Sequence, residues 1–92
     1  MHPLVNKKSC LLWNYDEVLP LLQENKNVKA CFYGHYHSGG YHYDETGLHH
    51  IVIASPLECL NDDVAYAIVE VYDDYIDIKG EGKIKKMKLS LR

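Results

Sequence analysis

The sequence predicts a small α+β fold in which antiparallel strands dominate and a single helix lies near the N-terminus. Apolar residues recur with helical spacing in residues 15–25, short segments of strand-like residues follow, and two tight turn sequences join neighbouring segments. A length of 92 residues, 47% of them hydrophobic and 25% charged, is ordinary for one small domain. A chain this short buries only roughly 60 to 65% of its extended surface, so we expect some apolar strand faces to be exposed.

The helix is predicted to begin after Asn14 and to reach about residue 25. Asn14 is a favourable capping residue, and Glu17 stands at the third position of the first turn, as in a capping box. Val18, Leu19, Leu21 and Leu22 supply the apolar face. Pro20 removes one backbone donor, so we expect it to kink or shorten the helix.

Five strands are predicted after the helix, at residues 28–33, 41–43, 50–54, 65–72 and 75–79. The turn sequence Asp44-Glu45-Thr46-Gly47 contains a glycine suited to positive φ, and Asp73-Asp74 separates the last two strands. Both indicate antiparallel hairpins. Residues alternate along 65–72, which predicts one aromatic, partly polar face and one aliphatic face.

The net charge of −3 hides an uneven distribution. Residues 1–78 carry 4 basic and 12 acidic side chains, whereas residues 79–92 carry 6 basic and 1 acidic. We interpret residues 78–92 as a basic tail, part of which we expect to be flexible. A positive segment in an otherwise acidic protein is more often solvated than bound to phosphates, so we do not predict nucleic-acid binding.

Cysteine usage and hydropathy place the chain among soluble proteins. Cys10, Cys31 and Cys59 are odd in number and have no C-x-x-C spacing, which argues against a disulfide framework and for a reducing compartment. No segment has the roughly 18 apolar residues of a membrane span, and no signal peptide is visible. We therefore expect a cytoplasmic location and no membrane partner.

The most informative motif is Gly34-His35-Tyr36-His37, which follows a predicted strand and precedes Ser38-Gly39-Gly40. A rigid strand followed by glycines can bring two imidazoles to one point. Five of the six histidines lie within sixteen residues, and neutral imidazole is a common ligand of manganese, iron and zinc. His35 and His37 are therefore the candidate metal ligands, although a catalytic metal centre needs at least three protein ligands.

The other histidines have a simpler interpretation. His49 and His50 are adjacent on a predicted strand, so their side chains should point to opposite faces. For His42, His49 and His50 we favour a structural role, or at most a hydrogen bond to a metal ligand. His42, His49 or Cys31 remains an alternative third donor for a single metal ion.

The motifs together resemble the C-terminal part of calcineurin-like metallophosphoesterases. The segments similar to the manganese-dependent ADP-ribose/CDP-alcohol diphosphatase branch begin at Cys10, Gly34, Gly47 and Val71, and read CLLWNYDE, GHYHSGGY, GLHH and VYDD. This resemblance covers nearly the whole chain, but only about the last third of such an enzyme.

The resemblance implies a partial unit of an α/β/β/α sandwich, to which this chain would contribute several strands of one sheet and one helix. It implies two divalent ions, manganese above all, with His35 on the second metal and His37 on the first, flanking a bridging water. The substrate would be a nucleotide-diphosphate conjugate. Cys10 and Tyr36 would lie on the substrate side, and Tyr36 and Ser38 replace the Thr and Asp usual in this branch.

The resemblance also implies that most of the metal site is absent from this chain. The Asp-x-His, Gly-Asp and Asn-His motifs of the family are missing, and so is its general acid, so no catalytic residue is assigned. About seven ligating side chains are called for and two are present, so the isolated chain should bind at most one metal weakly and be inactive. The alternatives are a non-catalytic metal-binding module and a partner-binding or self-associating fragment.

Overall fold

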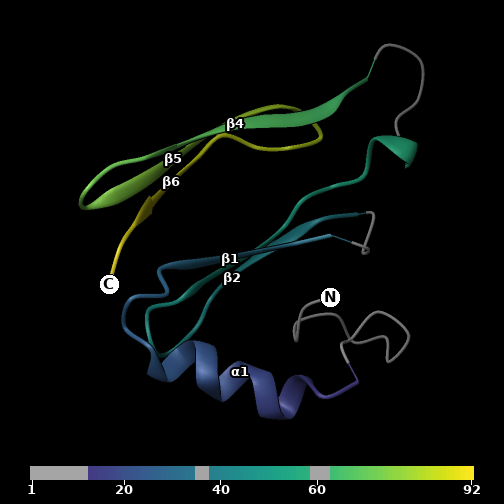
Figure 1. The fold of residues 1–92 in the computed structure, drawn as a ribbon. Helices are drawn as coiled ribbons and strands as arrows, with labels where there is room; N and C mark the ends of the chain where they lie inside the picture. Colours follow the sequence, from purple (N-terminus) through teal and green to yellow (C-terminus); the bar gives the residue numbers. More distant parts are fainter. Residues whose placement is uncertain (1–12, 35–37, 59–62) are drawn as a thin grey trace.

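The computed structural model describes residues 13–34, 38–58 and 63–92. Within these ranges the chain forms one α-helix, a short 3-10 helix and six strands (Figure 1). In chain order these are α1 (Tyr15–Glu24), β1 (Ala30–Tyr33), β2 (Gly40–Tyr43), β3 (His49–Val52), η2 (Pro56–Glu58), β4 (Ala65–Val71), β5 (Tyr75–Gly82) and β6 (Met87–Ser90).

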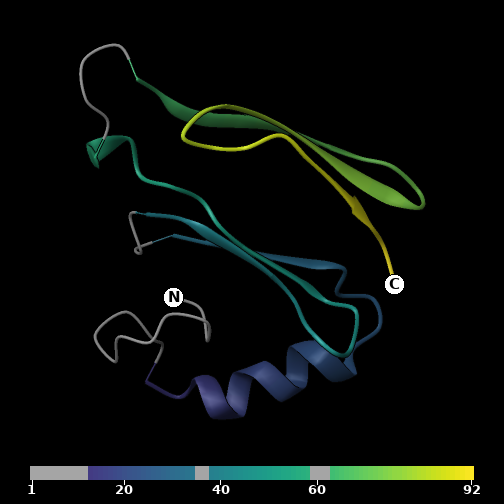
Figure 2. The same ribbon diagram turned by 180° about the vertical axis from the view of Figure 1, so that it is seen from behind.

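The strands form two three-stranded sheets, which we call sheet A, in the order β1-β3-β2, and sheet B, in the order β4-β5-β6. Figures 1 and 2 show α1 on one side of sheet A and sheet B on the other, so the layers are α/β/β. The predicted α+β class with mostly antiparallel strands is confirmed. The expectation that the strands belong to one sheet is wrong, because the segment after β3 carries the chain across to a second layer.

Helix α1 has the predicted position but not the predicted cap. The main-chain oxygen of Asn14 accepts hydrogen bonds from the amides of Glu17 (3.0 Å) and Val18 (3.2 Å), but the Asn14 side chain makes no capping bond. The helix continues through Pro20 to Glu24 without being cut short. A proline costs an interior helix one hydrogen bond, so packing and polar contacts elsewhere must stabilise this segment.

Sheet A combines a predicted hairpin with a parallel pair that the sequence did not indicate. β2 and β3 are antiparallel, joined by the turn in which the amide of Gly47 (φ 84°) donates to the oxygen of Asp44 at 3.0 Å. β1 pairs in parallel with β3, with Cys31 opposite His50. Parallel neighbours need a long connection and leave no turn signature, so pattern reasoning found the strands but not this pairing.

Sheet B contains the second predicted hairpin and one strand that was not predicted. The amide of Tyr72 donates to the oxygen of Tyr75 at 2.9 Å, which closes the turn at Asp73-Asp74. β6 lies within the segment interpreted as a basic tail, and pairs with β5 so that Leu89 is opposite Ile76. This strand is not predicted from the sequence because lysines alternate with Met87 and Leu89, so that charged residues dominate the local composition.

The core lies between the two sheets. Ile51 and Ala54 pack against four buried residues of sheet B and its β5–β6 connection, namely Ile76, Ile78, Ile84 and Leu89. The opposite face of sheet B is open: Tyr66 and Ile68 of β4 are 56% and 60% exposed. The predicted exposure of an apolar strand face is thus confirmed. No helix in the described part of the chain is long and apolar enough to cross a membrane.

Candidate metal site

The loop that carries the candidate ligands leaves β1 at Gly34 and returns at Ser38 to enter β2. Gly39 has φ 75°, and a Cβ there would lie 3.1 Å from both the Val52 oxygen and the Ala54 amide nitrogen. Only glycine fits this close approach at positive φ, so the returning end of the loop is fixed against the end of β3.

The residues predicted to act at this site lie outside the described residues. They are the metal ligands His35 and His37 and the substrate-side residues Cys10 and Tyr36. Their roles therefore stay predictions. What the structure does describe is the framework from which the loop departs, and that framework contains an unexpected set of polar contacts.

The first set joins the end of β1 to the α1 side of sheet A. The Tyr33 hydroxyl lies 2.9 Å from Nδ1 of His50, and Nε2 of His50 lies 2.8 Å from Oδ2 of Asp44. The phenol and imidazole rings are stacked, with centroids 5.8 Å apart. We call Tyr33, His50 and Asp44 the helix-side relay. His50 is only 1% exposed, so these are its partners in a site closed to water.

Asp44 is the point where the helix-side relay meets the hairpin turn and the helix. Its carboxylate accepts hydrogen bonds from the Thr46 amide (2.8 Å) and hydroxyl (2.6 Å), the Leu48 amide (3.1 Å) and Nε2 of Gln23 on α1 (3.1 Å). Burial by itself would raise the pKa of Asp44, but these bonds and the one from His50 outweigh it and hold that pKa well below the usual range. The carboxylate is therefore ionised and can only accept, so Nε2 of His50 donates.

A second set of contacts lies on the other face of sheet A. Nδ1 of His49 is 2.8 Å from the Tyr41 hydroxyl, and Nε2 of His49 is 2.6 Å from the main-chain oxygen of Ser90 on β6. We call Tyr41, His49 and the Ser90 carbonyl the sheet-side relay. Because a carbonyl can only accept, Nε2 of His49 also donates. This relay joins sheet A to sheet B.

These contacts show what His49 and His50 do in this chain. Both ring nitrogens of each imidazole are within 3 Å of a protein partner, and the two side chains point to opposite faces, as predicted. Burial raises the pKa of the Cys31 thiol. Within the described residues no three His, Cys, Asp or Glu side chains group as a metal site would require.

The C-terminal end of α1 is held by a residue that the sequence did not single out. The Arg92 guanidinium donates to the main-chain oxygens of Leu22 (3.0 Å), Gln23 (3.1 Å), Asn25 (2.8 Å) and Val28 (3.0 Å), and to the Thr46 hydroxyl (3.0 Å). The last carbonyls of a helix lack intrahelical partners, so this is where a cation is most useful. Arg92 thereby joins α1 to the turn that contains Asp44.

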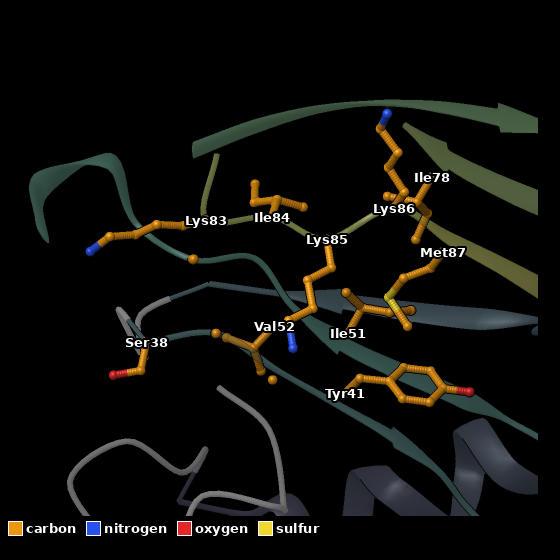
Figure 3. A pocket seen from close by; sticks show the side chains of 13 residues that line it. Ser38, Tyr41, Ile51, Val52, Ile78, Lys83, Ile84, Lys85, Lys86 and Met87 are labelled. Atoms are coloured by element: carbon orange, nitrogen blue, oxygen red, sulfur yellow. The ribbon is translucent and has the colours of Figure 1, made fainter. Parts of the chain in front are cut away.

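A cavity of about 590 Å³ opens beside the returning end of the loop (Figure 3). Its walls are mostly apolar core residues such as Ile51, Ile78 and Met87, while Ser38 and the lysines of the β5–β6 connection stand around them. In Figure 3 the Lys85 side chain extends from the β5–β6 connection toward Val52 of sheet A. Sequence reasoning had placed these lysines on a solvated tail.

Comparison with known proteins gives matches along nearly the whole chain. No family model matches. A manganese-dependent ADP-ribose/CDP-alcohol diphosphatase of Arabidopsis thaliana is 36% identical over 85 residues, which are 92% of this chain and 27% of that protein. The Oryza sativa protein of the same name is 42% identical over 76 residues, covering 83% of this chain and 24% of its own length. The human one is 33% identical over 84 residues, covering 91% and 25%.

One solved structure agrees with these sequence matches. The crystal structure of a dimetal phosphatase from Danio rerio superposes with a TM-score of 0.91 at 30% identity, over 99% of this chain and 29% of that one. The chain thus has the fold of one part of a dimetal phosphatase. Within that class it is homologous to the manganese-dependent ADP-ribose/CDP-alcohol diphosphatases, which confirms the resemblance. It spans about a quarter of the length of the curated relatives that it matches.

Proposed function

We propose that this chain is the C-terminal segment of a calcineurin-like, metal-dependent phosphohydrolase that cleaves the pyrophosphate of ADP-ribose or CDP-alcohol type substrates. The main support is the match of 99% of this chain, at 30% identity, to part of a dimetal phosphatase. The relatives named above supply the substrate class. We also propose a cytoplasmic location, on the cysteine usage of the sequence.

In this proposal the chain contributes His35 and His37 as metal ligands, with Cys10 and Tyr36 on the substrate side. Imidazole suits manganese. The histidine-bearing loop follows Tyr33, the last residue of β1, whose hydroxyl contacts His50. When bound, the two metal ions would activate a water and neutralise charge on the pyrophosphate oxygens. This chain's own part is to hold two imidazoles at the end of sheet A.

The same proposal makes the isolated chain inactive. Two histidines alone would hold one ion weakly, because a catalytic metal centre needs at least three protein ligands. The side chains of Tyr66, Ile68 and Val71 on β4 are exposed, and Val71 is 71% exposed. Such exposed apolar side chains suit a segment whose fold is completed by a partner or by self-association. Either process would cover apolar surface that this chain leaves in water.

Reconstitution tests the proposal directly. The chain is mixed with a recombinant N-terminal segment carrying the missing family motifs, Mn²⁺ and ADP-ribose, and release of AMP is followed by chromatography. We expect cleavage by the mixture, none by either part alone, and none with His35→Ala together with His37→Ala. A mixture that forms a stable complex and still releases no AMP would contradict the proposal.

Metal binding separates this function from a non-catalytic alternative. A stoichiometric transition-metal site of high affinity in the isolated chain would favour a metal-binding module. Millimolar affinity, with activity only after reconstitution, would favour the phosphohydrolase. Affinity should also fall as pH drops through the usual histidine range near 6.5, because a ligating imidazole must be neutral.

A further inference from the structure

We infer that two copies of this chain associate through the free edge of β4, antiparallel and with Ile68 on the two-fold axis. The pairing joins the three strands of sheet B from each copy into one continuous sheet of six. The interaction surface is thus a sheet edge, and the partner is a second copy of the chain. The inference stands on the geometry of sheet B and does not depend on the proposed hydrolase function.

The strand β4 differs from the other edge strands of the two sheets. Sheet B ends at β4 and β6, and sheet A ends at β1 and β2. β4 has seven residues, whereas the other three have four each. A free edge is a row of unpaired main-chain donors and acceptors, which proteins shield with short strands, lysine or proline. The sequence of β4, AYAIVEV, contains neither lysine nor proline, and no described strand pairs with its outer edge.

The side chains on the core face of β4 are covered along only part of the strand. Alternation places Ala65, Ala67, Val69 and Val71 on this face. The two alanines pack against the core. Val69 and Val71, however, are 41% and 71% exposed. The core therefore stops part of the way along β4, and two valines that face the same way lie beyond it in water.

An antiparallel pairing centred on Ile68 is complementary to itself on this face. Paired residues lie the same number of positions from the axis, so Val71 of one copy meets Ala65 of the other, and Val69 meets Ala67. Each exposed valine then lies beside a small residue that packs against the core. Each copy thereby extends the apolar core of the other, and the valines leave water.

The one charged residue of β4 fits the same register. Glu70 lies on the open face, opposite Tyr66 of the other copy and not opposite a second Glu70. Like charges directly opposite each other would oppose the pairing, whereas a carboxylate beside a phenol does not. Lys79 of the same copy already pairs with Glu70. Moving the axis by one residue, to Val69, would instead place Glu70 against the apolar Ile68, so the register centred on Ile68 is favoured.

Acidic residues just outside the strand set the salt dependence of the association. Asp63 and Asp73 are each five positions from Ile68 and lie two residues beyond the ends of β4. The pairing therefore brings Asp63 of one copy near Asp73 of the other, and the two charges repel. Added salt screens such exposed charges, so we expect it to strengthen the association.

The experiment is sedimentation velocity of the purified chain over a range of concentrations, with a reductant present so that cysteines cannot cross-link two copies. The melting temperature shows that each variant is folded. We expect the mass to rise with concentration from that of one chain, 10.6 kDa, toward twice that value. Ile68→Lys should weaken association by about tenfold or more, because two lysines then meet on the axis. Ile68→Glu should do the same, and an equimolar mixture of the two variants should recover the dimer.

Tyr66→Lys is the matched control. Tyr66 and Ile68 lie on the same face of β4 and have nearly equal exposure, 56% and 60%. The lysine at position 66 would meet Glu70 of the other copy, so association should be retained or strengthened. If two copies instead packed their open faces together, both lysine variants would weaken the association alike.

Several results would overturn the inference. They are a wild-type chain that stays monomeric at the highest concentration, equal weakening by Ile68→Lys and Tyr66→Lys, a mixture of the two Ile68 variants that stays monomeric, and a dimer that salt weakens. A monomeric wild type would leave this edge free for the missing segment of the proposed hydrolase. None of these results decides the proposed function, whose own test is the release of AMP by the reconstituted mixture.

Discussion

Sheet A has a tyrosine–histidine pair on each face, and Nε2 of the histidine has a different acceptor in each pair. On the α1 side, His50 donates to the buried carboxylate of Asp44. On the sheet B side, His49 donates to the neutral main-chain oxygen of Ser90. Two adjacent histidines, each paired with a tyrosine, thus connect the sheet to two different layers, one through a carboxylate and the other through a main-chain carbonyl.

The difference matters because a carboxylate can gather more partners than a carbonyl. Asp44 accepts from the hairpin turn, from β3 and from α1, whereas the Ser90 oxygen serves to bring β6 against His49. Removing the charged group should therefore disturb several elements at once, while the loss of a contact on the other face should stay local. The same reasoning ranks Asp44 above the Arg92 contacts on α1, and these above the exposed Glu70–Lys79 ion pair of sheet B.

Asp44→Ala should produce the largest loss of stability. It leaves the Nε2 hydrogen of His50 and the Leu48 amide without partners in a buried region, and it frees Gln23 from the hairpin. Breaking one side of a buried, charged hydrogen-bonded group costs about 3 kcal/mol or more. Urea unfolding followed by circular dichroism measures it. A loss under about 1 kcal/mol would mean that Asp44 does not organise this face.

The stability that the ionised Asp44 carboxylate contributes should be lost in acid. Hydrogen bonds lower the pKa of Asp44 in the folded chain below its ordinary value of 3.8, so the folded state favours the ionised form. The resulting stability is complete above about pH 5 and is lost as pH falls toward the lowered pKa. The difference in urea midpoint between wild type and Asp44→Asn should therefore shrink between about pH 5 and pH 2. A constant difference would mean that Asp44 is not ionised at neutral pH.

Local signals in the sequence predicted the two hairpins, the helix and the opposite directions of the two adjacent histidines. Turn residues at Asp44 to Gly47 and at Asp73-Asp74 indicated both hairpins, since turn chemistry is decided by neighbouring residues. The alternation of His49 and His50 indicated that they would point to opposite faces, and the contacts confirm it. The helix was found from its apolar spacing, although its capping bond was not formed.

What the sequence could not predict depends on contacts between distant residues. Asp44 was interpreted only as a turn residue, because nothing local shows that its carboxylate meets His50 and Gln23. Arg92 contacts residues more than 60 positions away, and the parallel pairing of β1 with β3 leaves no turn to read. The candidate ligands His35 and His37 were found from a motif, and their role remains a prediction.

Arg92→Lys should cost less than Asp44→Ala but more than an exposed ion pair. The guanidinium fork reaches carbonyl oxygens of Leu22, Asn25 and Val28 at once, which a single ammonium group cannot do. We expect a loss of about 1 to 2 kcal/mol and reduced helical signal before the sheets unfold. Hydrogen exchange of the α1 amides would locate the effect. Unchanged exchange in α1 would show that Arg92 does not hold the helix.

The exposed ion pair of sheet B supplies the smallest expected effect and the sharpest contrast with Asp44. Glu70 pairs with Lys79 and also accepts from the Tyr72 hydroxyl at 3.1 Å, and these contacts lower the pKa of Glu70. Water and salt screen such a pair, because both side chains lie on the open face of the sheet. Glu70→Gln should leave the urea midpoint unchanged within error, with or without added salt. A clear, salt-sensitive loss would mean that this face is covered in solution, for example by a second copy of the chain, and that charge in sheet B is as well sheltered as charge beside α1.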